Sequence, residues 1–306
     1  VLASDGGSDF VYADYGCGPG AAAFDSATAV FGAAHSHEPS RNLIANLQDQ
    51  PGNDWSTVTG RIRDYSGAAD NALSPISWSM CVGSFYNQVL PAGSVHVASS
   101  IMAVHFLSAQ PNVTIPRSAS PVDAEGDDRQ RLAQSAAADW LTFWQRRSVE
   151  LKPGGAMVVR PIGSDDGRSR TTAVQVNRAL GLAAHELAGR GILAQSFADS
   201  YVIGAYPRTL QELREPFDQG RLPDLELVEA SMHVDPDPIR MRYESDGDAD
   251  RYARDLTLFV RGWSDTSVRT NLVKPGLEAL GESATPSDIE SVTNQIYGLM
   301  EEWWRQ

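Results

Sequence analysis

A glycine-rich turn near the N-terminus constrains the fold of this 306-residue chain more than any other feature. The segment Asp14–Gly20 (DYGCGPG) begins at the end of a β-rich run, Phe10–Tyr15. It leads into an alanine-rich run with helical spacing, Gly20–His35. Glycines let the backbone turn tightly and approach a ligand closely. The start of the following helix offers free N–H groups that suit a carboxylate. The sequence therefore predicts a ligand-binding turn between the first strand and the first helix.

Two ligands are compatible with this turn. The pattern D-x-G-x-G-x-G fits the amino-acid end of a sulfonium methyl donor, whose ammonium group Asp14 would bind. Gly16, Gly18 and Ala21 also fit the relaxed G-x-G-x-x-G pattern of dinucleotide-binding proteins. The acid before the glycines and the further glycine Gly20 favour the methyl donor, because a carboxylate would repel a pyrophosphate. A glycine turn that binds nothing is the third interpretation.

A second acid, Asp49, follows the next predicted strand, Asn42–Leu47. In doubly wound folds an acid at that place commonly holds ribose hydroxyls. Asp49 lies further along the chain than the usual spacing of about 20 residues, and Glu38, in a predicted loop, is a rival. A solvated acid in a turn is the alternative for Asp49.

Predicted strands and helices alternate over most of the chain. Further strands are expected at Trp78–Val82, Ser94–Ala98, Ala156–Ile162 and Asp224–Met232. A long amphipathic helix is expected at Arg129–Lys152 and a further helix at Thr171–Gly189. Alternation of this kind predicts an α/β fold with a largely parallel, doubly wound sheet.

The alternation stops after His233, where Asp248–Trp263 and Ser287–Trp304 have helical periodicity and predict an α-helical cap. We therefore expect an α/β core over residues 1–163, its continuation with part of the cap over 164–235, and a mainly helical cap over 236–306.

Composition narrows the class of partner. The net charge is −14 and the pI is about 4.8, so we expect no nucleic-acid partner, because phosphates would be repelled. No apolar run reaches the roughly 18–20 residues of a membrane span, so we expect no membrane partner. Two cysteines, Cys17 and Cys81, cannot form a disulfide framework, which favours a cytoplasmic location.

Five segments, in chain order, resemble landmarks of one enzyme family. They are Ala13–Cys17 (family A-D-L-G-C), Gln48–Trp55 (N-D-L-P-G-N-D-F), Gly83–Tyr86 (G-S-F-Y), Leu90–Ser108 (L-F-P and then S-L-H-F-V-H-S-S-Y-S-L-H-W-L-S) and Gly154–Val159 (G-G-R-M-V-L). The chain from Asp14 to about Leu280 thus resembles the SABATH family of S-adenosylmethionine-dependent carboxyl and N-methyltransferases, in a bacterial-type form.

The resemblance implies a class I methyltransferase fold, a Rossmann-like doubly wound sheet with an α-helical cap. It implies S-adenosylmethionine as cofactor, S-adenosylhomocysteine as its product, a small-molecule acid as substrate, and a homodimer. The implied cofactor-binding residues are Asp14, Gly16, Cys17, Gly18, Asp49, Gln50, Ser84, Phe85, Ser99 and Ser100. The implied substrate-binding residues are Met102, His105, Phe106, Asn177, Tyr206 and Trp263.

The implied reaction is in-line SN2 transfer of a methyl group to a carboxylate, giving a methyl ester. A carboxylate, with a pKa of roughly 4, is ionised at neutral pH and needs no general base. We therefore assign no acid–base catalyst, and His105 is the only candidate for one.

Two departures from the family pattern bear on the acceptor and on metals. Phe106 stands where carboxylate-methylating members have Trp, and a phenyl ring cannot donate a hydrogen bond. The adjacent His105 could donate in its place, pack as a core residue, or act as a base towards a ring nitrogen or a phenol. N- or O-methylation of a heterocyclic or phenolic metabolite, and non-catalytic donor binding, are therefore alternatives. Val202 replaces a metal-binding Asn of some members, so we predict no metal.

Overall fold

The computed structural model describes residues 9–66, 73, 75–165, 172–282 and 284–306. The chain forms two compact units. Unit 1 comprises residues 1–108, 136–163 and 208–230, and unit 2 comprises residues 109–135, 164–207 and 231–306. Each unit draws on segments that are distant in sequence.

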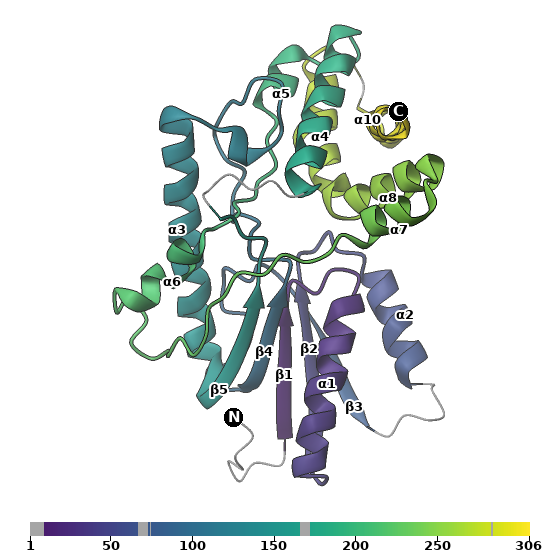
Figure 1. Cartoon of the computed structure of the whole chain (residues 1–306). Coiled ribbons are helices and arrows are strands. Elements are labelled where there is room, and N and C mark those ends of the chain that lie inside the picture. The colour runs from purple at the N-terminus through teal and green to yellow at the C-terminus, as the bar shows by residue number, and fades with distance from the viewer. Residues whose placement is uncertain (1–8, 67–72, 74, 166–171, 283) are drawn as a thin grey trace. The chain divides into compact units, whose positions relative to one another are not determined.

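Unit 1 is built on a parallel five-stranded sheet with the order β3-β2-β1-β4-β5 (Figure 1). The strands are β1 (Asp9–Tyr15), β2 (Asn42–Asp49), β3 (Ile76–Val82), β4 (Val95–Ile101) and β5 (Leu151–Arg160). The predicted α/β fold with a doubly wound parallel sheet is confirmed. The strand order reverses between β1 and β4, and ligands of such sheets bind at the carboxyl ends of the strands at that point.

Helices cover the two faces of this sheet. On one face, α1 (Ala21–His37) places Phe31 against Phe10 and Tyr12 of β1, and α2 (Trp55–Ser66) follows β2. On the other face, α3 (Gly126–Glu150) packs Phe143 against Tyr15. Side chains of a strand alternate between its two faces, so β1 contributes to both layers of the core.

The connection between β3 and β4 contains no helix along its described residues 83–94. Phe85, Tyr86 and Leu90 of this connection instead join the hydrophobic cluster of Phe143 and Trp140 on α3. The loop therefore occupies part of the face that a crossover helix covers in other doubly wound sheets. Its backbone needs hydrogen-bond partners other than those of a helix.

The prediction of a strand at Asp224–Met232 is wrong, because the chain is irregular there, after α6 (Leu210–Asp218). Leu225 and Leu227 are half-buried, as alternation predicts, but the next residue, Val228, is 89% exposed. Two alternating leucines do not fix a strand that lacks a hydrogen-bonded neighbour.

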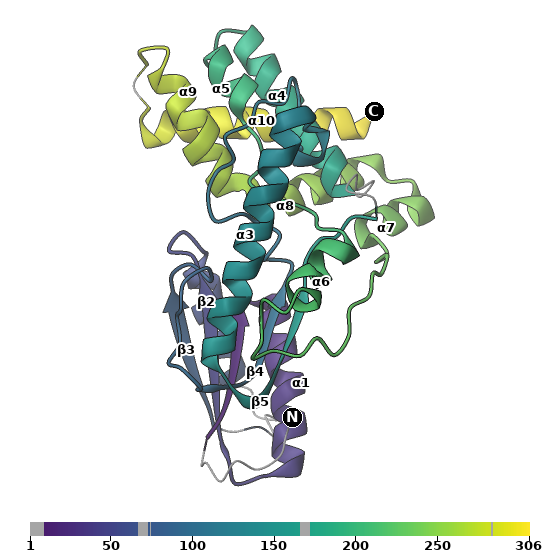
Figure 2. The ribbon, with the colours of Figure 1, turned by 90° about the vertical axis from the view of Figure 1, so that its left-hand side faces the viewer.

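Unit 2 is mainly helical. Its elements are η1 (Pro121–Asp123), α4 (Thr172–Gly189), α5 (Gln195–Ser200), α7 (Pro238–Asp246), α8 (Ala249–Ser267), the π-helical η2 (Val268–Val273), α9 (Lys274–Glu278) and α10 (Pro286–Arg305). Within this unit α10 packs against α8 and α4 (Figure 2). The helices predicted near 171–189, 248–263 and 287–304 are confirmed as α4, α8 and α10.

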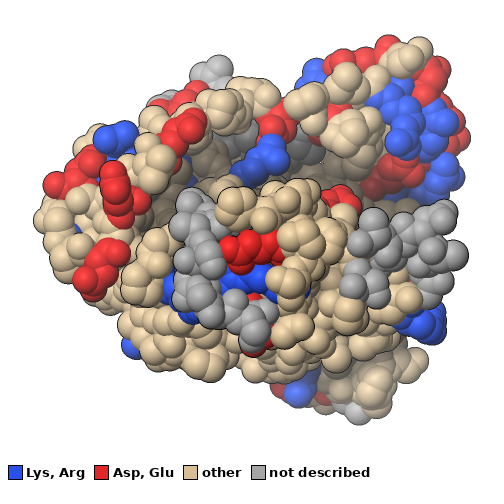
Figure 3. All heavy atoms as spheres, turned by 90° about the horizontal axis from the view of Figure 1, so that it is seen from below, with Lys and Arg blue, Asp and Glu red and all other residues tan. Residues whose placement is uncertain are grey.

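Positive and negative side chains are mixed on the face of the molecule shown in Figure 3. On the face shown in Figure 3, Lys and Arg side chains are interspersed with Asp and Glu among a larger uncharged area. Among the helices that the structure describes, none has the length and apolar character needed to cross a bilayer.

Candidate functional site

The residues that the sequence assigned to a donor site gather at the carboxyl edge of the sheet. Asp14 lies near the end of β1, Asp49 ends β2, and Ser99 and Ser100 lie near the end of β4. Ser84 and Phe85 follow β3. Parallel strands bring these ends to one edge, so residues up to 86 positions apart in sequence become neighbours there.

The glycine turn has a backbone that other residues adopt with difficulty. The φ angles of Gly16, Gly18 and Gly20 are 85°, 53° and 96°. A Cβ atom on Gly16 would lie 2.2 Å from the Cβ of Ala103, closer than any real contact. The N–H groups of Gly16 and Cys17 each donate to the carbonyl of Gln48 at 2.9 Å. The turn is therefore closed against β2 on one side and against the loop after β4 on the other.

Asp14 is a buried carboxylate, 2% exposed, on the α1 side of the sheet. Its Oδ2 accepts hydrogen bonds from the Ser99 hydroxyl and, at 3.2 Å, from the Tyr12 hydroxyl. Burial raises the pKa of Asp14 to about 6 against the effect of these two bonds, and the nearby charge of Asp49 adds to the increase. Such a group is stabilised in its charged form by a cationic ligand.

Asp49 is held by the backbone of the turn itself. Its Oδ2 accepts the N–H of Gly18 at 2.6 Å, and its Oδ1 accepts the N–H of Gln50 at 2.7 Å. Burial raises the pKa of Asp49, while these bonds oppose the increase. The rival acid Glu38 lies at the other end of α1, where it forms an ion pair with Arg41.

This arrangement fits a methyl donor better than a dinucleotide. Two carboxylates, Asp14 and Asp49, flank the turn, and Asp49 already occupies the Gly18 amide that a phosphate would need. A ligand with an ammonium group, a sulfonium and ribose hydroxyls suits these two carboxylates, because it offers them positive charge and hydroxyl groups that donate hydrogen bonds. A pyrophosphate would meet two negative charges.

The other expected donor-site residues lie around the same turn. Phe85 is buried, and its ring edge would lie 3.6 Å from a Cβ on Gly16. The Gln48 side chain donates to the Gly83 carbonyl at 2.6 Å and so fixes the start of the Ser84–Phe85 loop beside the turn. Burial raises the pKa of the Cys17 thiol well above its usual range, so this cysteine is an unreactive packing group.

The loop after β4, residues 102–108, carries the expected acceptor-site residues of unit 1. Met102 has a φ of 56°, a left-handed conformation that is uncommon for a residue with a side chain, and its side chain is 48% exposed. Strained backbone of this kind is frequent at functional sites. Phe106 packs against His105 with ring centroids 4.5 Å apart.

His105 is a buried imidazole that contacts the backbone of the chain after β5. Its Nδ1 accepts a long hydrogen bond, 3.5 Å, from the Ile162 N–H. Burial lowers the pKa of His105 to about 3, and the charge of Arg208 contributes. At neutral pH the ring is therefore neutral, and the contact at Nδ1 favours the tautomer with the proton on Nε2, in which that nitrogen can donate a hydrogen bond.

Sequence reasoning missed several residues that hold these loops. Tyr12 hydrogen-bonds Ser99 at 2.6 Å, and Tyr86 donates its hydroxyl to the Phe106 carbonyl at 2.6 Å. Arg208, 1% exposed, donates to the carbonyls of Val104 at 2.8 Å and Ala136 at 2.7 Å. Tyr86 was visible as the last residue of G-S-F-Y, whereas no motif in the sequence assigns a role to Arg208.

The three remaining acceptor-site predictions, Asn177, Tyr206 and Trp263, belong to unit 2. Asn177 is 8% exposed, and its Oδ1 has no hydrogen-bond partner among the described residues. Their participation in the site stays a prediction. Across the described part of the chain, no group of three or more His, Cys, Asp or Glu residues could hold a metal ion.

The sheet order, the glycine turn and the acid that ends β2 define a class I S-adenosylmethionine-dependent methyltransferase. Within that class, the chain belongs to the SAM dependent carboxyl methyltransferase family, known as SABATH, whose sequence model matches residues 2–288. S-adenosylmethionine is accordingly its cofactor.

Several methyltransferases of fungi and plants are similar to this chain in sequence. The chain is 28% identical over 276 residues to the O-methyltransferase acrG of Aspergillus aculeatus, covering 87% of this chain and 70% of that protein. Gibberellic acid methyltransferase 2 of Arabidopsis thaliana is 26% identical over 170 residues, covering 49% of this chain and 44% of the relative. The alignments span 49% of the Gibberella fujikuroi methyltransferase FUS9 and 65% of the Fusarium methyltransferase LUC1.

A solved structure shares the whole fold. Loganic acid methyltransferase with S-adenosylhomocysteine superimposes with a TM-score of 0.74 at 19% identity, covering 97% of this chain and 78% of that one. At this identity the likeness concerns the fold.

Proposed function

We propose that this protein transfers a methyl group from S-adenosylmethionine to the carboxylate of a small-molecule acid and forms a methyl ester. The observation that carries the proposal is the state of His105, a neutral imidazole whose Nδ1 is already engaged by the Ile162 N–H. It leaves Nε2–H as a donor, which is the role that the family's Trp performs at the place of Phe106.

The donor side would be held by residues of unit 1. Bound S-adenosylmethionine supplies a methyl group that is electrophilic because it is attached to a sulfonium. Asp14 would hold the ammonium group and Asp49 the ribose hydroxyls, while Phe85 would pack beside the adenine. Ser99 positions the Asp14 carboxylate, and Ser100 fixes the Tyr15 carbonyl at 2.7 Å just before the turn. These contacts orient the donor, which is the main source of rate in an in-line displacement.

The acceptor side favours a carboxylate. A carboxylate is ionised at neutral pH, whereas a phenol or a protonated ring nitrogen must lose a proton to a base. His105, with a pKa of about 3, is a poor base at neutral pH. Relatives named for acids agree with this choice, among them an indole-3-acetate O-methyltransferase of rice, 28% identical over 198 residues.

The proposal extends to assembly and location. We expect a cytoplasmic homodimer, and the two free cysteines, Cys17 and Cys81, accord with a reducing compartment. Light scattering of the purified protein measures the assembly directly.

The test is a radiolabelled-methyl screen over aromatic, indolic, terpenoid and fatty acids. Label transferred to an ester is released by mild alkali, whereas N-methyl and aryl ether products keep it. Release of the label supports the proposal, and alkali-stable product would replace it with N- or O-methylation. Because a probable caffeine synthase of Camellia sinensis is 24% identical over 184 residues, xanthines belong in the panel. Donor binding without turnover of any compound would favour a non-catalytic role.

A further inference from the structure

A fully buried ion pair lies in the last turn of α3. Arg147 and Glu150 are both 0% exposed, with Arg147 Nε 2.9 Å from Glu150 Oε2 and Nη2 donating to Oε1 at 3.0 Å. The guanidinium carbon lies 4.0 Å from the centroid of the Tyr15 ring. Buried ion pairs are often replaced by apolar side chains without loss of stability, so stability alone does not explain this pair.

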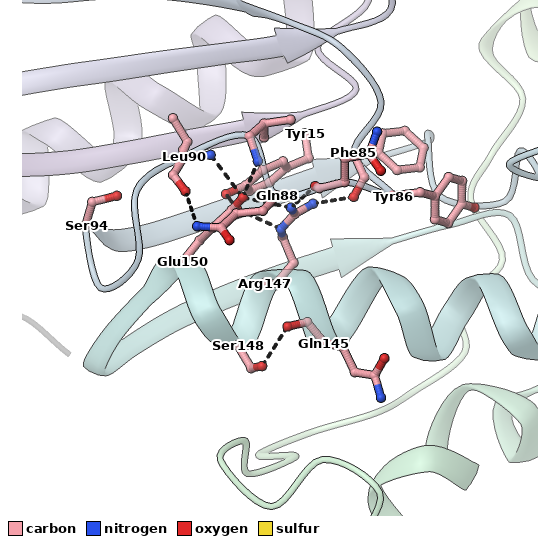
Figure 4. Close-up of polar contacts among 12 residues, drawn as sticks. Tyr15, Phe85, Tyr86, Gln88, Leu90, Ser94, Gln145, Arg147, Ser148 and Glu150 are labelled. Atoms are coloured by element: carbon pink, nitrogen blue, oxygen red, sulfur yellow. Dashed lines mark hydrogen bonds and ion pairs between the residues drawn. The ribbon is translucent and has the colours of Figure 1, made fainter.

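The pair supplies hydrogen bonds to the backbone of the loop after β3 (Figure 4). Arg147 donates to the carbonyls of Phe85 at 2.7 Å and Asn87 at 2.9 Å. Glu150 Oε1 accepts the N–H groups of Val89 at 2.6 Å and Leu90 at 3.0 Å. Four backbone groups of a loop without helix or strand therefore depend on two side chains.

The same pair also reaches the glycine turn. The Tyr15 hydroxyl donates to Glu150 Oε2 at 2.5 Å, and Tyr15 immediately precedes Gly16. Glu150 thus links the loop that carries Ser84 and Phe85 to the strand that carries the turn. One carboxylate sets the spacing between the two segments assigned to the adenine and amino-acid ends of the donor.

We propose that Arg147 and Glu150 are positioning residues for the donor site, holding the Gly83–Leu90 loop in register with the glycine turn. The proposal rests on the assignment of this loop to the donor, which is part of the proposed function. It does not depend on the acceptor, because donor binding is measured without one.

The test compares two buried arginines by titration calorimetry with S-adenosylmethionine and S-adenosylhomocysteine. Arg147→Lys keeps the charge but loses the forked donation to Phe85 and Asn87, and we expect its donor Kd to rise about tenfold. Arg41→Lys is the matched control, since Arg41 is also buried and donates to a backbone carbonyl, that of Asp9 at 2.6 Å, but at the amino end of β1, away from the carboxyl edge of the sheet. Its donor Kd should change by less than about twofold, while its unfolding midpoint falls as far as that of Arg147→Lys.

A milder variant guards against loss of folding. Tyr15→Phe keeps the ion pair and removes only the hydroxyl bond to Glu150, and its donor Kd should rise about threefold. Glu150→Gln should speed amide hydrogen exchange at Val89 and Leu90. An unchanged donor Kd in Arg147→Lys or in Tyr15→Phe overturns the proposal. So does an equal rise in Arg147→Lys and Arg41→Lys, which would indicate general destabilisation.

Discussion

Asp14 offers a test of how the donor site trades stability for binding. Its carboxyl is almost completely buried, and its pKa rises from an ordinary 3.8 to about 6. At about 1.4 kcal/mol for each pKa unit, ionised Asp14 costs the apoprotein about 3 kcal/mol of folding free energy. Because the folded-state pKa is raised, the stability given by the protonated form is fully present below pH 3.8 and is lost as the pH rises through 6.

Asp14→Asn should therefore stabilise the apoprotein while it abolishes donor binding. An amide still accepts from the Ser99 and Tyr12 hydroxyls but carries no charge to be buried. We expect the variant to unfold in urea at a higher midpoint than the wild type at about pH 7.5, with a gain of up to about 3 kcal/mol. The gain should shrink to near zero at about pH 4, where wild-type Asp14 is protonated.

The pH dependence separates this explanation from ordinary repacking. Urea unfolding of both proteins across about pH 4 to 8, without ligand, measures the difference, and titrating groups that do not interact with Asp14 cancel in it. A variant that is less stable than the wild type at pH 7.5, or a difference that does not vary with pH, would refute the reasoning. Saturating S-adenosylmethionine should reverse the order of stability, since only the wild type binds it.

Three further outcomes are expected. Donor affinity should fall about tenfold per pH unit below pH 6 and stay constant between pH 6 and about pH 7, because Asp14 must be ionised and the donor's amino group protonated for the two to pair. Below pH 6, calorimetry in two buffers of different ionisation enthalpy detects the proton that Asp14 releases. Gly16→Ala should eliminate donor binding, since its Cβ would lie 2.2 Å from that of Ala103, and Ala103→Gly in the same chain should restore part of it. Absence of any restoration would contradict the role given to this contact and leave the φ of 85° as the cause. His105→Phe should raise the KM of an accepted acid about tenfold, whereas His105→Gln, which keeps an N–H donor, should raise it less; equal KM values would remove His105 from the acceptor site.

Elements with a strong apolar pattern could be predicted from the sequence, and weakly buried ones could not. The helices α4, α8 and α10 show a helical repeat, and the structure has them at the expected places. In contrast, α7 buries none of its residues and shows no apolar stripe. The unpredicted helix α2 does carry a short stripe, Trp55, Val58, Ile62 and Tyr65, but only Val58 in it is fully buried. Leu225 and Leu227 mimicked a strand because periodicity cannot tell whether a neighbouring strand exists.

The candidate site likewise contains residues that could be predicted from the sequence and residues that could not. The place of the turn and strand-end residues at one edge of the sheet was predictable, because a local motif and the alternating strands and helices fix it. Arg147 and Arg208 were not, because they act on carbonyls 62 and 104 residues away in sequence. A single arginine in a helix or a loop gives no sign of the backbone that it will meet after folding.

The close packing of Gly16 against Ala103 has a practical consequence for redesign of the acceptor range. Any side chain larger than alanine at position 103 would push directly on the turn, so a library that randomises this position would lose the donor before it gained a new acceptor. Met102, half of whose side chain is exposed, and Phe106 are the neighbouring positions at which diversity can be introduced without that loss. Neighbouring positions of this loop therefore differ in the substitutions that they can accept.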